Sequence, residues 1–177
     1  MLAAAWGFAE ATLFFVVPDV LLTWLAGFRP GLAWRAVVAC LVGALVGGAL
    51  MFVLALESPE AVRAWVAAVP AISEAFMAST AAALREDFGP AMLRAGFTGV
   101  PYKVLAVESG ADGRSFAAFL ALSVPARLSR WVLLVLVAQG VAAFVRARVR
   151  EPDRVLRTSW AGGWGLVYAV YFSVMEW

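Results

Sequence analysis

The fold is decided by the stretch FFVVPDVLL at residues 14–22, which runs on to Gly27. A second stretch, FTGVPYKVL at residues 97–105, begins 83 positions later and runs on to Gly110. Both follow the pattern F-x-x-V-P-x-x-x-L-x-x-x-x-G, an apolar segment that a proline interrupts and a charged residue follows. At membrane depth, non-helical backbone and charge are tolerated only where protein or a water-filled cavity satisfies them. Two such segments in corresponding halves predict a transporter with its site between the repeats; the alternative is chance similarity between segments rich in Leu, Val and Pro.

The composition excludes a soluble globular protein. Hydrophobic residues make up 64% of the chain and charged residues only 15%, whereas soluble domains carry about 25% charged residues. A chain of 177 residues is one membrane domain with little left over. The chain has no histidine, which excludes catalytic triads, metal sites and proton relays that need an imidazole. Its single cysteine, Cys40, is expected to be a packed core thiol.

The two prolines are predicted to form the tips of re-entrant hairpins. Pro18 and Pro101 each lack a backbone donor and disfavour helix at the preceding residue. The arms on either side of Pro18 have about ten residues, or about 15 Å of helix, which reaches halfway through a hydrocarbon core of about 30 Å. A kinked spanning helix is the alternative. We expect an all-α integral membrane protein in which two proline-centred re-entrant hairpins and transmembrane helices form a pseudo-inverted repeat.

The remaining segments complete a single membrane domain. The clearest spanning helix covers residues 34–56, and Pro125 is expected to divide residues 115–145 into a short arm and a second helix. Glu108 and Asp112 are expected to lie in a turn or at a hairpin mouth, and the aromatic residues of the last helix to anchor it at the membrane interface. The predicted organisation of residues 1–177 is a first half at 3–56, an amphipathic linker at 57–88, a second half at 89–145, a basic loop at 146–157 and a C-terminal helix at 158–177.

Arginines set the expected orientation. Five arginines between residues 146 and 157 assign that loop to the cytoplasm by the positive-inside rule. The second hairpin then opens to the outside, whereas Arg29 and Arg35 place the mouth of the first hairpin inside. Entry from opposite faces is what an inverted repeat requires. The expected location is the inner (plasma) membrane of a bacterium.

Five charged residues are predicted to share one central site. Glu10 and Asp19 lie on opposite arms of the first hairpin, and Lys103 follows the second proline. Arg127 and Arg130 lie on one face of a later helix. Charges at membrane depth face the interior of a bundle and pair with the opposite sign; the alternative is that these side chains reach out to the headgroups. Carboxylates beside fixed cations can couple proton movement to an anionic substrate. Helix N-termini at the hairpin tips add positive potential for a phosphate.

The motifs resemble those of a known family. The stretch GFTGVPYKV at residues 96–104, followed by Gly110 and by RLSR at 127–130, resembles the second half of the DedA family, also called the VTT or SNARE-associated family, in its YqaA-like branch. The stretch FAEAT at residues 8–12, with the later Pro-Asp, resembles the opening re-entrant segment of that family. The resemblance covers roughly residues 6–145. It departs from the family at Gly99, where the motif usually has its first proline.

The resemblance implies two re-entrant hairpins and the movement of lipids across membranes. Members of the family are linked to recycling of the undecaprenyl phosphate carrier, to phospholipid scrambling and to proton-dependent membrane homeostasis. It places the functional acids on Glu10 and Asp19 and the basic residues on Lys103, Arg127 and Arg130.

We therefore expect a transporter or scramblase for a phosphate-bearing lipid, coupled to protons, with an anionic headgroup as its partner. No cofactor, metal or nucleic acid is expected, and the oligomeric state stays open. Two alternatives are a membrane homeostasis or assembly factor that transports nothing and a proton-driven transporter of small solutes or ions. An enzyme is not expected, because no nucleophile and base stand in register.

Overall fold

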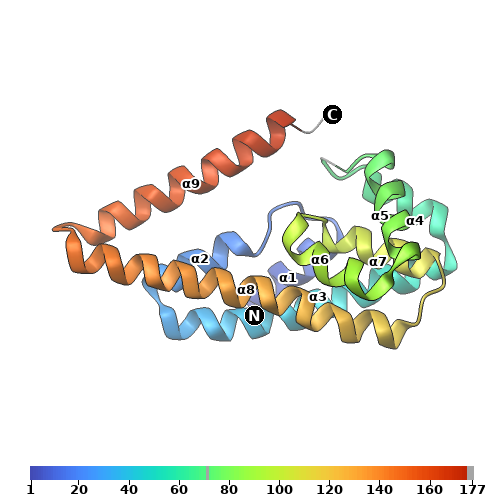
Figure 1. The fold of residues 1–177 in the computed structure, drawn as a ribbon, viewed down its shortest axis with the longest axis horizontal. Coiled ribbons are helices and arrows are strands. Elements are labelled where there is room, and N and C mark those ends of the chain that lie inside the picture. Colours follow the sequence, from blue (N-terminus) through green and yellow to red (C-terminus); the bar gives the residue numbers. More distant parts are fainter. Residues whose placement is uncertain (71, 175–177) are drawn as a thin grey trace.

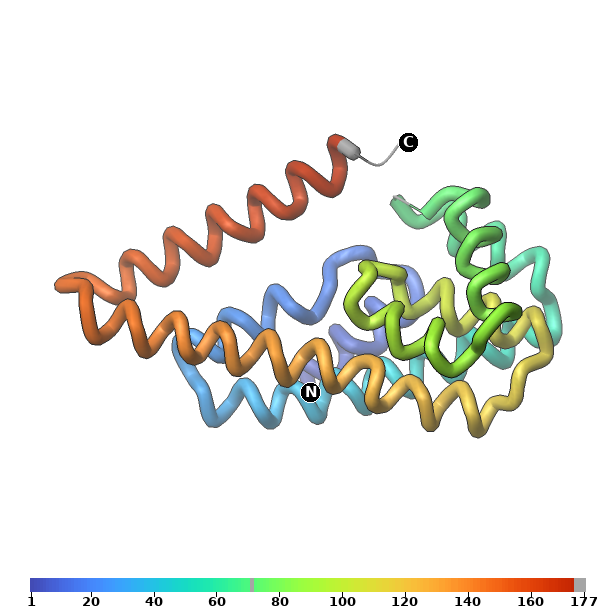
Figure 2. The backbone as a smooth tube through the Cα atoms, viewed as in Figure 1, coloured from blue at the N-terminus to red at the C-terminus, as the bar shows by residue number. Residues whose placement is uncertain are grey.

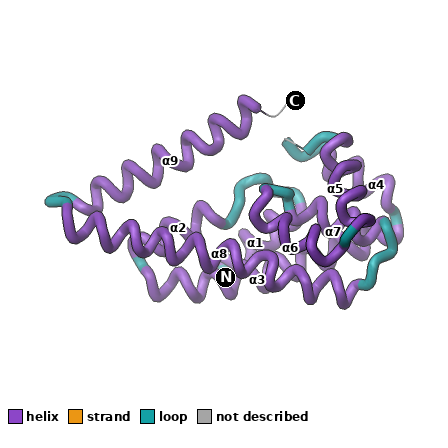
Figure 3. Tube along the Cα trace, in the orientation of Figure 1, coloured by secondary structure: helices purple, strands orange, loops and turns teal. Residues whose placement is uncertain are grey.

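The computed structural model describes residues 1–70 and 72–174, and this part of the chain is helical and contains no strand (Figures 1 and 3). Nine helices follow one another in it: α1 (Leu2–Thr12), α2 (Asp19–Phe28), α3 (Pro30–Glu57), α4 (Pro59–Ala67), α5 (Glu74–Glu86), α6 (Phe88–Thr98), α7 (Tyr102–Ala111), α8 (Phe116–Arg148) and α9 (Pro152–Val174).

The two long helices α3 and α8 form the frame of the molecule and run side by side along its length (Figure 1). The rings of Phe52 on α3 and Phe119 on α8 meet at one end, with centroids 5.2 Å apart. The two helices have 28 and 33 residues, and their most apolar 18-residue stretches have mean hydropathies of 2.6 and 1.9. Both are therefore long and apolar enough to cross a membrane. Proline at the first position of α3 has the fixed φ that a helix start requires.

The outer faces of both long helices are apolar and open. Only 17% of the most apolar window of α8 is buried, and 44% of that of α3. A core helix of a soluble protein would instead be covered by its neighbours. The exposed apolar side chains include Val38, Val42, Val46, Leu50 and Val53 on α3, and Leu133, Leu136, Val137, Val141 and Phe144 on α8.

The chain is interrupted at both sequence repeats. Residues 13–18 separate α1 from α2, and residues 99–101 separate α6 from α7, so neither segment forms one continuous helix. Pro18 and Pro101 stand immediately before α2 and α7, with φ angles of −58° and −61° that suit a helix start. Gly99 ends α6 with φ of +83°, a left-handed conformation that glycine adopts without strain. This requirement gives a physical reason for glycine at position 99.

The short helices pack on the long ones in an exchanged pattern. Helix α1 packs on α3 and α6 packs on α8, so the first arm of each half contacts the long helix of its own half. The second arms cross over: α7 packs on α3, and α2 packs on α8. Glycines allow the close approach, because a Cβ on Gly43 would overlap the carbonyl oxygen of Ala4, and one on Gly96 would overlap that of Ala126.

We expect Gly43→Ala and Gly96→Ala each to lower the free energy of unfolding by about 1–3 kcal/mol, because the new methyl group meets a carbonyl of a neighbouring helix. The matched control is Gly140→Ala, which meets no atom within 4 Å and is expected to be neutral or to stabilise by up to about 1 kcal/mol. Reversible unfolding in mixed micelles measures all three. If Gly43→Ala and the Gly140→Ala control had equal free energies of unfolding, this description of the packing would be wrong.

Helix α8 differs from the sequence prediction, because it continues through Pro125 instead of ending there. An internal proline removes one helical hydrogen bond and costs about 3 kcal/mol or more in an exposed helix. Here packing holds the helix on both sides: Phe119 contacts the ring of Phe52, and Ala126 lies against Gly96. The predicted division into a short arm and a separate helix is therefore wrong.

The predicted basic loop at 146–157 is also mostly helical. Helix α8 extends to Arg148 and α9 begins at Pro152, which leaves only residues 149–151 between them. Arginine is a good helix former, and proline suits the first position of a helix. The C-terminal helix therefore starts earlier than predicted, and its last predicted residues, 175–177, lie outside the described residues.

The predicted amphipathic linker forms two helices, α4 and α5, and charged pairs hold them against the end of α7. Glu108 was expected in a turn or at a mouth, but it lies inside α7, buried, and accepts two hydrogen bonds from Arg63 at 3.0 and 2.6 Å. This contact raises the pKa of Arg63. Asp112 follows α7 and pairs with Arg85 at 2.9 Å and Arg114 at 2.8 Å; the hydrogen bond from Arg85 in particular lowers the pKa of Asp112.

Candidate functional site

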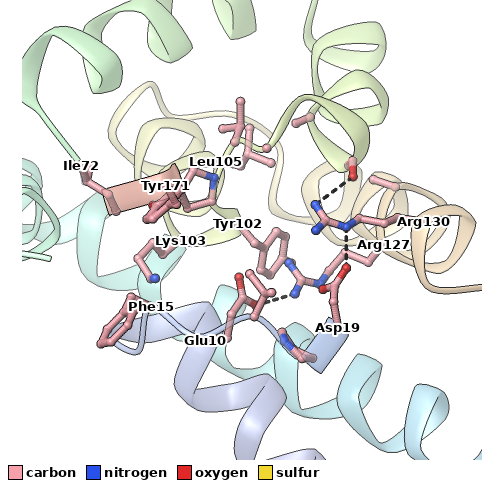
Figure 4. A pocket seen from close by; sticks show the side chains of 18 of the residues that line it. Glu10, Phe15, Asp19, Ile72, Tyr102, Lys103, Leu105, Arg127, Arg130 and Tyr171 are labelled. Carbon is pink, nitrogen blue, oxygen red and sulfur yellow. Dashed lines mark hydrogen bonds and ion pairs between the residues drawn. The ribbon is translucent and has the colours of Figure 1, made fainter. Parts of the chain in front are cut away.

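The five charged residues singled out in the sequence all line one cavity between the two halves (Figure 4). The cavity has a volume of about 230 Å³. Both helix breaks, the inner faces of α6 and α8, one face of α9 and the turn between α4 and α5 form its walls. Pro18 and Pro101 lie in these walls as well, so the two repeated motifs contribute to the same space.

Two ion pairs join the halves across this cavity. Glu10 on α1 accepts a hydrogen bond from Arg127 on α8. Asp19, the first residue of α2, accepts one from Nε of Arg130 at 2.8 Å and another from Nε1 of Trp131 at 3.3 Å. The two acids are only 5% and 2% exposed, and buried carboxylates need such partners. The three-residue spacing of the arginines puts both on one face of α8.

The two arginines occupy different surroundings. The guanidinium of Arg127 makes cation–π contacts with the rings of Tyr102 and Trp131, 4.4 and 4.6 Å from their centroids. Its side chain is 11% exposed, against 35% for Arg130. Arg130 also donates a long hydrogen bond of 3.4 Å to the carbonyl of Gly96. Arg127 is therefore part of the packed wall, and Arg130 is the more accessible cation.

Lys103 is the third cation of the cavity. The residue is 2% exposed, and Nζ donates to the carbonyl oxygen of Phe14 at 2.9 Å, in the first helix break. An ammonium group has three donors, and no carboxylate of the described chain lies within ion-pair distance of this one. Two acids and three cations give the described lining a net charge of +1. The cavity therefore favours an anion.

The backbone adds to this potential. Helices α2 and α7 both begin at the cavity, at Asp19 and Tyr102. The first N–H groups of a helix have no partner within that helix, and the helix dipole places partial positive charge there. Two helix N-termini beside three cationic side chains form surroundings that suit a phosphate.

Helix α9 supplies an aromatic wall that sequence reasoning missed. Trp164, Tyr168 and Tyr171 line the cavity, although we expected the aromatic residues of this helix to be interfacial anchors. The Tyr168 hydroxyl accepts a hydrogen bond of 3.1 Å from the backbone N–H of Val17, which lies in the first helix break. Trp164 donates to the hydroxyl of Thr23 at 3.0 Å. The helical spacing of these rings was the available signal, but it does not reveal which way the helix faces.

Helix α9 packs mainly against α2 and α8. The helix turns back from the end of α8 and diverges from the bundle (Figure 2), and it also contacts the first helix break through Tyr168 and Phe172.

Among the described residues, no group of three or more His, Cys, Asp and Glu side chains is arranged to hold a metal ion. Comparisons with models of protein families, with curated proteins and with solved structures find no match.

Proposed function

We propose that this protein is a DedA-type membrane transporter or scramblase that moves a phosphate-bearing lipid, either a polyprenyl phosphate or a phospholipid, with proton coupling. One observation carries the proposal: the acids of the first half pair with the arginines of the second half in a cavity that retains an unpaired lysine. Charge of this kind at membrane depth marks substrate and proton pathways.

Placement in a membrane, with the two breaks as re-entrant hairpins, is part of this proposal. It is supported by the apolar, open faces of α3 and α8. Helix α2 is apolar but has only ten residues, or about 15 Å, too short to cross a hydrocarbon core of about 30 Å. The exchanged packing, with each second arm on the long helix of the other half, supports an inverted repeat whose site lies between the repeats.

The size of the cavity favours a headgroup as the part of the substrate that enters. Sites that enclose a drug-sized ligand have volumes of about 300–1,000 Å³, and this cavity has about 230 Å³. A phosphate fits inside while the acyl or prenyl chains stay in the lipid. The phosphate binds to Lys103 and to the accessible side of Arg130, in line with the net positive charge of the lining.

The ion pairs offer a route for coupling to protons. Protonation of Glu10 or Asp19 weakens its pair with Arg127 or Arg130 and increases the positive charge that faces the phosphate. Loss of the proton restores the pair and favours release. This cycle links the uptake of a proton to the binding of an anion.

Translocation in vesicles tests the proposal. Purified protein is reconstituted with labelled phospholipid, labelled polyprenyl phosphate, or the corresponding neutral polyprenol. We expect the protein to accelerate translocation of a phosphate-bearing lipid and not of the neutral alcohol. No acceleration of any lipid would favour a homeostasis or assembly factor, and uptake of a small anion alone would favour a solute transporter.

The neutral variants Glu10→Gln and Asp19→Asn are expected to uncouple translocation from pH while leaving headgroup binding largely intact, because the amide keeps the shape of the side chain without its titration. Translocation rates across a pH series, measured beside headgroup binding, test this expectation. A wild-type pH profile in both variants would exclude these acids as the proton carriers.

A further inference from the structure

Two turns meet at one end of the molecule, far from α4 and α5 (Figure 1). One joins α2 to α3 and the other joins α8 to α9. Arg146, near the end of α8, donates a hydrogen bond of 2.6 Å to the carbonyl oxygen of Gly27, the penultimate residue of α2. The guanidinium of Arg157 on α9 lies 5.7 Å from the ring centroid of Phe28. These contacts fix the two turns beside each other.

This end, which we call the arginine end, carries a concentrated positive charge. It comprises residues 27–35 and 146–157, with seven arginines, all exposed, and two acids, for a net charge of +5. The two acids neutralise little of this positive charge. Asp153 lies 3.8 Å from Arg146 and Glu151 lies 3.5 Å from Arg154, and all four side chains are 42–80% exposed. Exposed pairs of this kind contribute little. The arginines are Arg29, Arg35, Arg146, Arg148, Arg150, Arg154 and Arg157.

The charge begins where the apolar surface ends. Phe144 is exposed on the last turns of α8, and Arg148, one turn further, places its guanidinium 5.1 Å from the centroid of the Phe144 ring. On α3, Val38 is exposed, and Arg35, about one turn nearer the start of the helix, is exposed as well. The same transition on two neighbouring helices matches the boundary between the hydrocarbon core and the headgroups of one leaflet.

We infer that the arginine end binds the phosphate headgroups of anionic lipids in one leaflet, at a surface separate from the central cavity. Arginine is suited to this role because its guanidinium forms paired hydrogen bonds with phosphate oxygens. The opposite end of the molecule does not carry an excess of positive charge. Residues 57–87 together with 112–114 contain six acids and three arginines, so only the arginine end attracts an anionic leaflet. The inference rests on the proposed membrane placement but not on lipid transport.

A lipid titration tests the inference. The full chain in neutral detergent micelles is titrated with phosphatidylglycerol or with phosphatidylcholine, and its unfolding temperature is measured. We expect phosphatidylglycerol to raise the unfolding temperature and phosphatidylcholine to leave it unchanged, with the difference reduced in 0.5 M NaCl because salt screens exposed charges. Equal effects of the two lipids would overturn the inference, and so would equal stabilisation by inorganic phosphate alone, which would indicate a site for small anions.

Variants locate the surface. Each arginine removed is expected to weaken phosphatidylglycerol binding about fivefold, so Arg148→Gln, Arg150→Gln and Arg154→Gln together should weaken it about 100-fold. The same three positions changed to lysine should retain most of the binding, because the charge remains. Arg94→Gln, an exposed arginine on α6, is the matched control and should bind as the wild type does. Unchanged binding in the triple glutamine variant would overturn the inference; if that variant does not fold, the salt dependence of the wild type decides.

Discussion

Replacing Arg127 with alanine is expected to lower the free energy of unfolding by about 3–5 kcal/mol, because it leaves the buried carboxylate of Glu10 without its partner. The variant also loses the cation–π contacts with Tyr102 and Trp131. Reversible unfolding in mixed micelles measures the loss. Arg94→Ala removes an exposed arginine on α6 and is the control, with an expected change within about 0.5 kcal/mol.

A double variant distinguishes the effect of leaving Glu10 charged and unpaired from the effect of losing the Arg127 side chain. Arg127→Met combined with Glu10→Leu removes both charges and keeps apolar volume, so it is expected to recover much of the stability that the single variant loses. If the double variant is no more stable than Arg127→Ala, the stability does not depend on the charge of Glu10 and this account of the ion pair is wrong.

Replacing Arg130 is expected to change the rate of transport more than the free energy of unfolding. The side chain of Arg130 is 35% exposed, and Asp19 keeps the hydrogen bond from Trp131 when Arg130 is removed. Arg130→Ala should lower translocation of a phosphate-bearing lipid by about 10- to 150-fold at every pH, which corresponds to a lost hydrogen bond with a charged group. Arg130→Lys should recover part of the rate, because lysine keeps the charge without the fork of donors.

Translocation in vesicles across a pH series checks this expectation, with Arg94→Ala again as the control. Comparison with the variants Glu10→Gln and Asp19→Asn shows whether the charged residues act in transport or only stabilise the fold. Equal losses for Arg130→Ala, Glu10→Gln and Asp19→Asn at all pH values would indicate an ion-pair network that only supports the fold.

Those parts of the fold and site that depend on strong local rules could be predicted from the sequence. The helix breaks before Pro18 and Pro101 follow from the missing backbone donor and the restricted residue before each proline. That the charged residues lie together could be predicted because an isolated charge in apolar surroundings is costly. Glu10 and Asp19 do both have arginine partners.

The parts that depend on tertiary packing could not be predicted. Pro125 remains inside α8 because contacts on both sides of it hold the helix, which no local rule reveals. The cation–π contacts of Arg127 join rings on α7 and α8 that are 29 residues apart in the sequence. The aromatic face of α9 is held toward the cavity by contacts with the first half, in which Trp164 donates to Thr23 and Tyr168 accepts from Val17.

The most direct test of the central claim, a single phosphate site shared by the two halves, is equilibrium binding of a short-chain polyprenyl phosphate to purified protein in neutral micelles. We expect the wild type to bind one molecule and to bind the neutral polyprenol at least tenfold more weakly. We also expect Lys103→Met to weaken phosphate binding by at least tenfold, through loss of a charge-assisted hydrogen bond, and Arg94→Ala to leave it unchanged. Equal affinity for the phosphate and the alcohol, or wild-type affinity in Lys103→Met, would contradict the account.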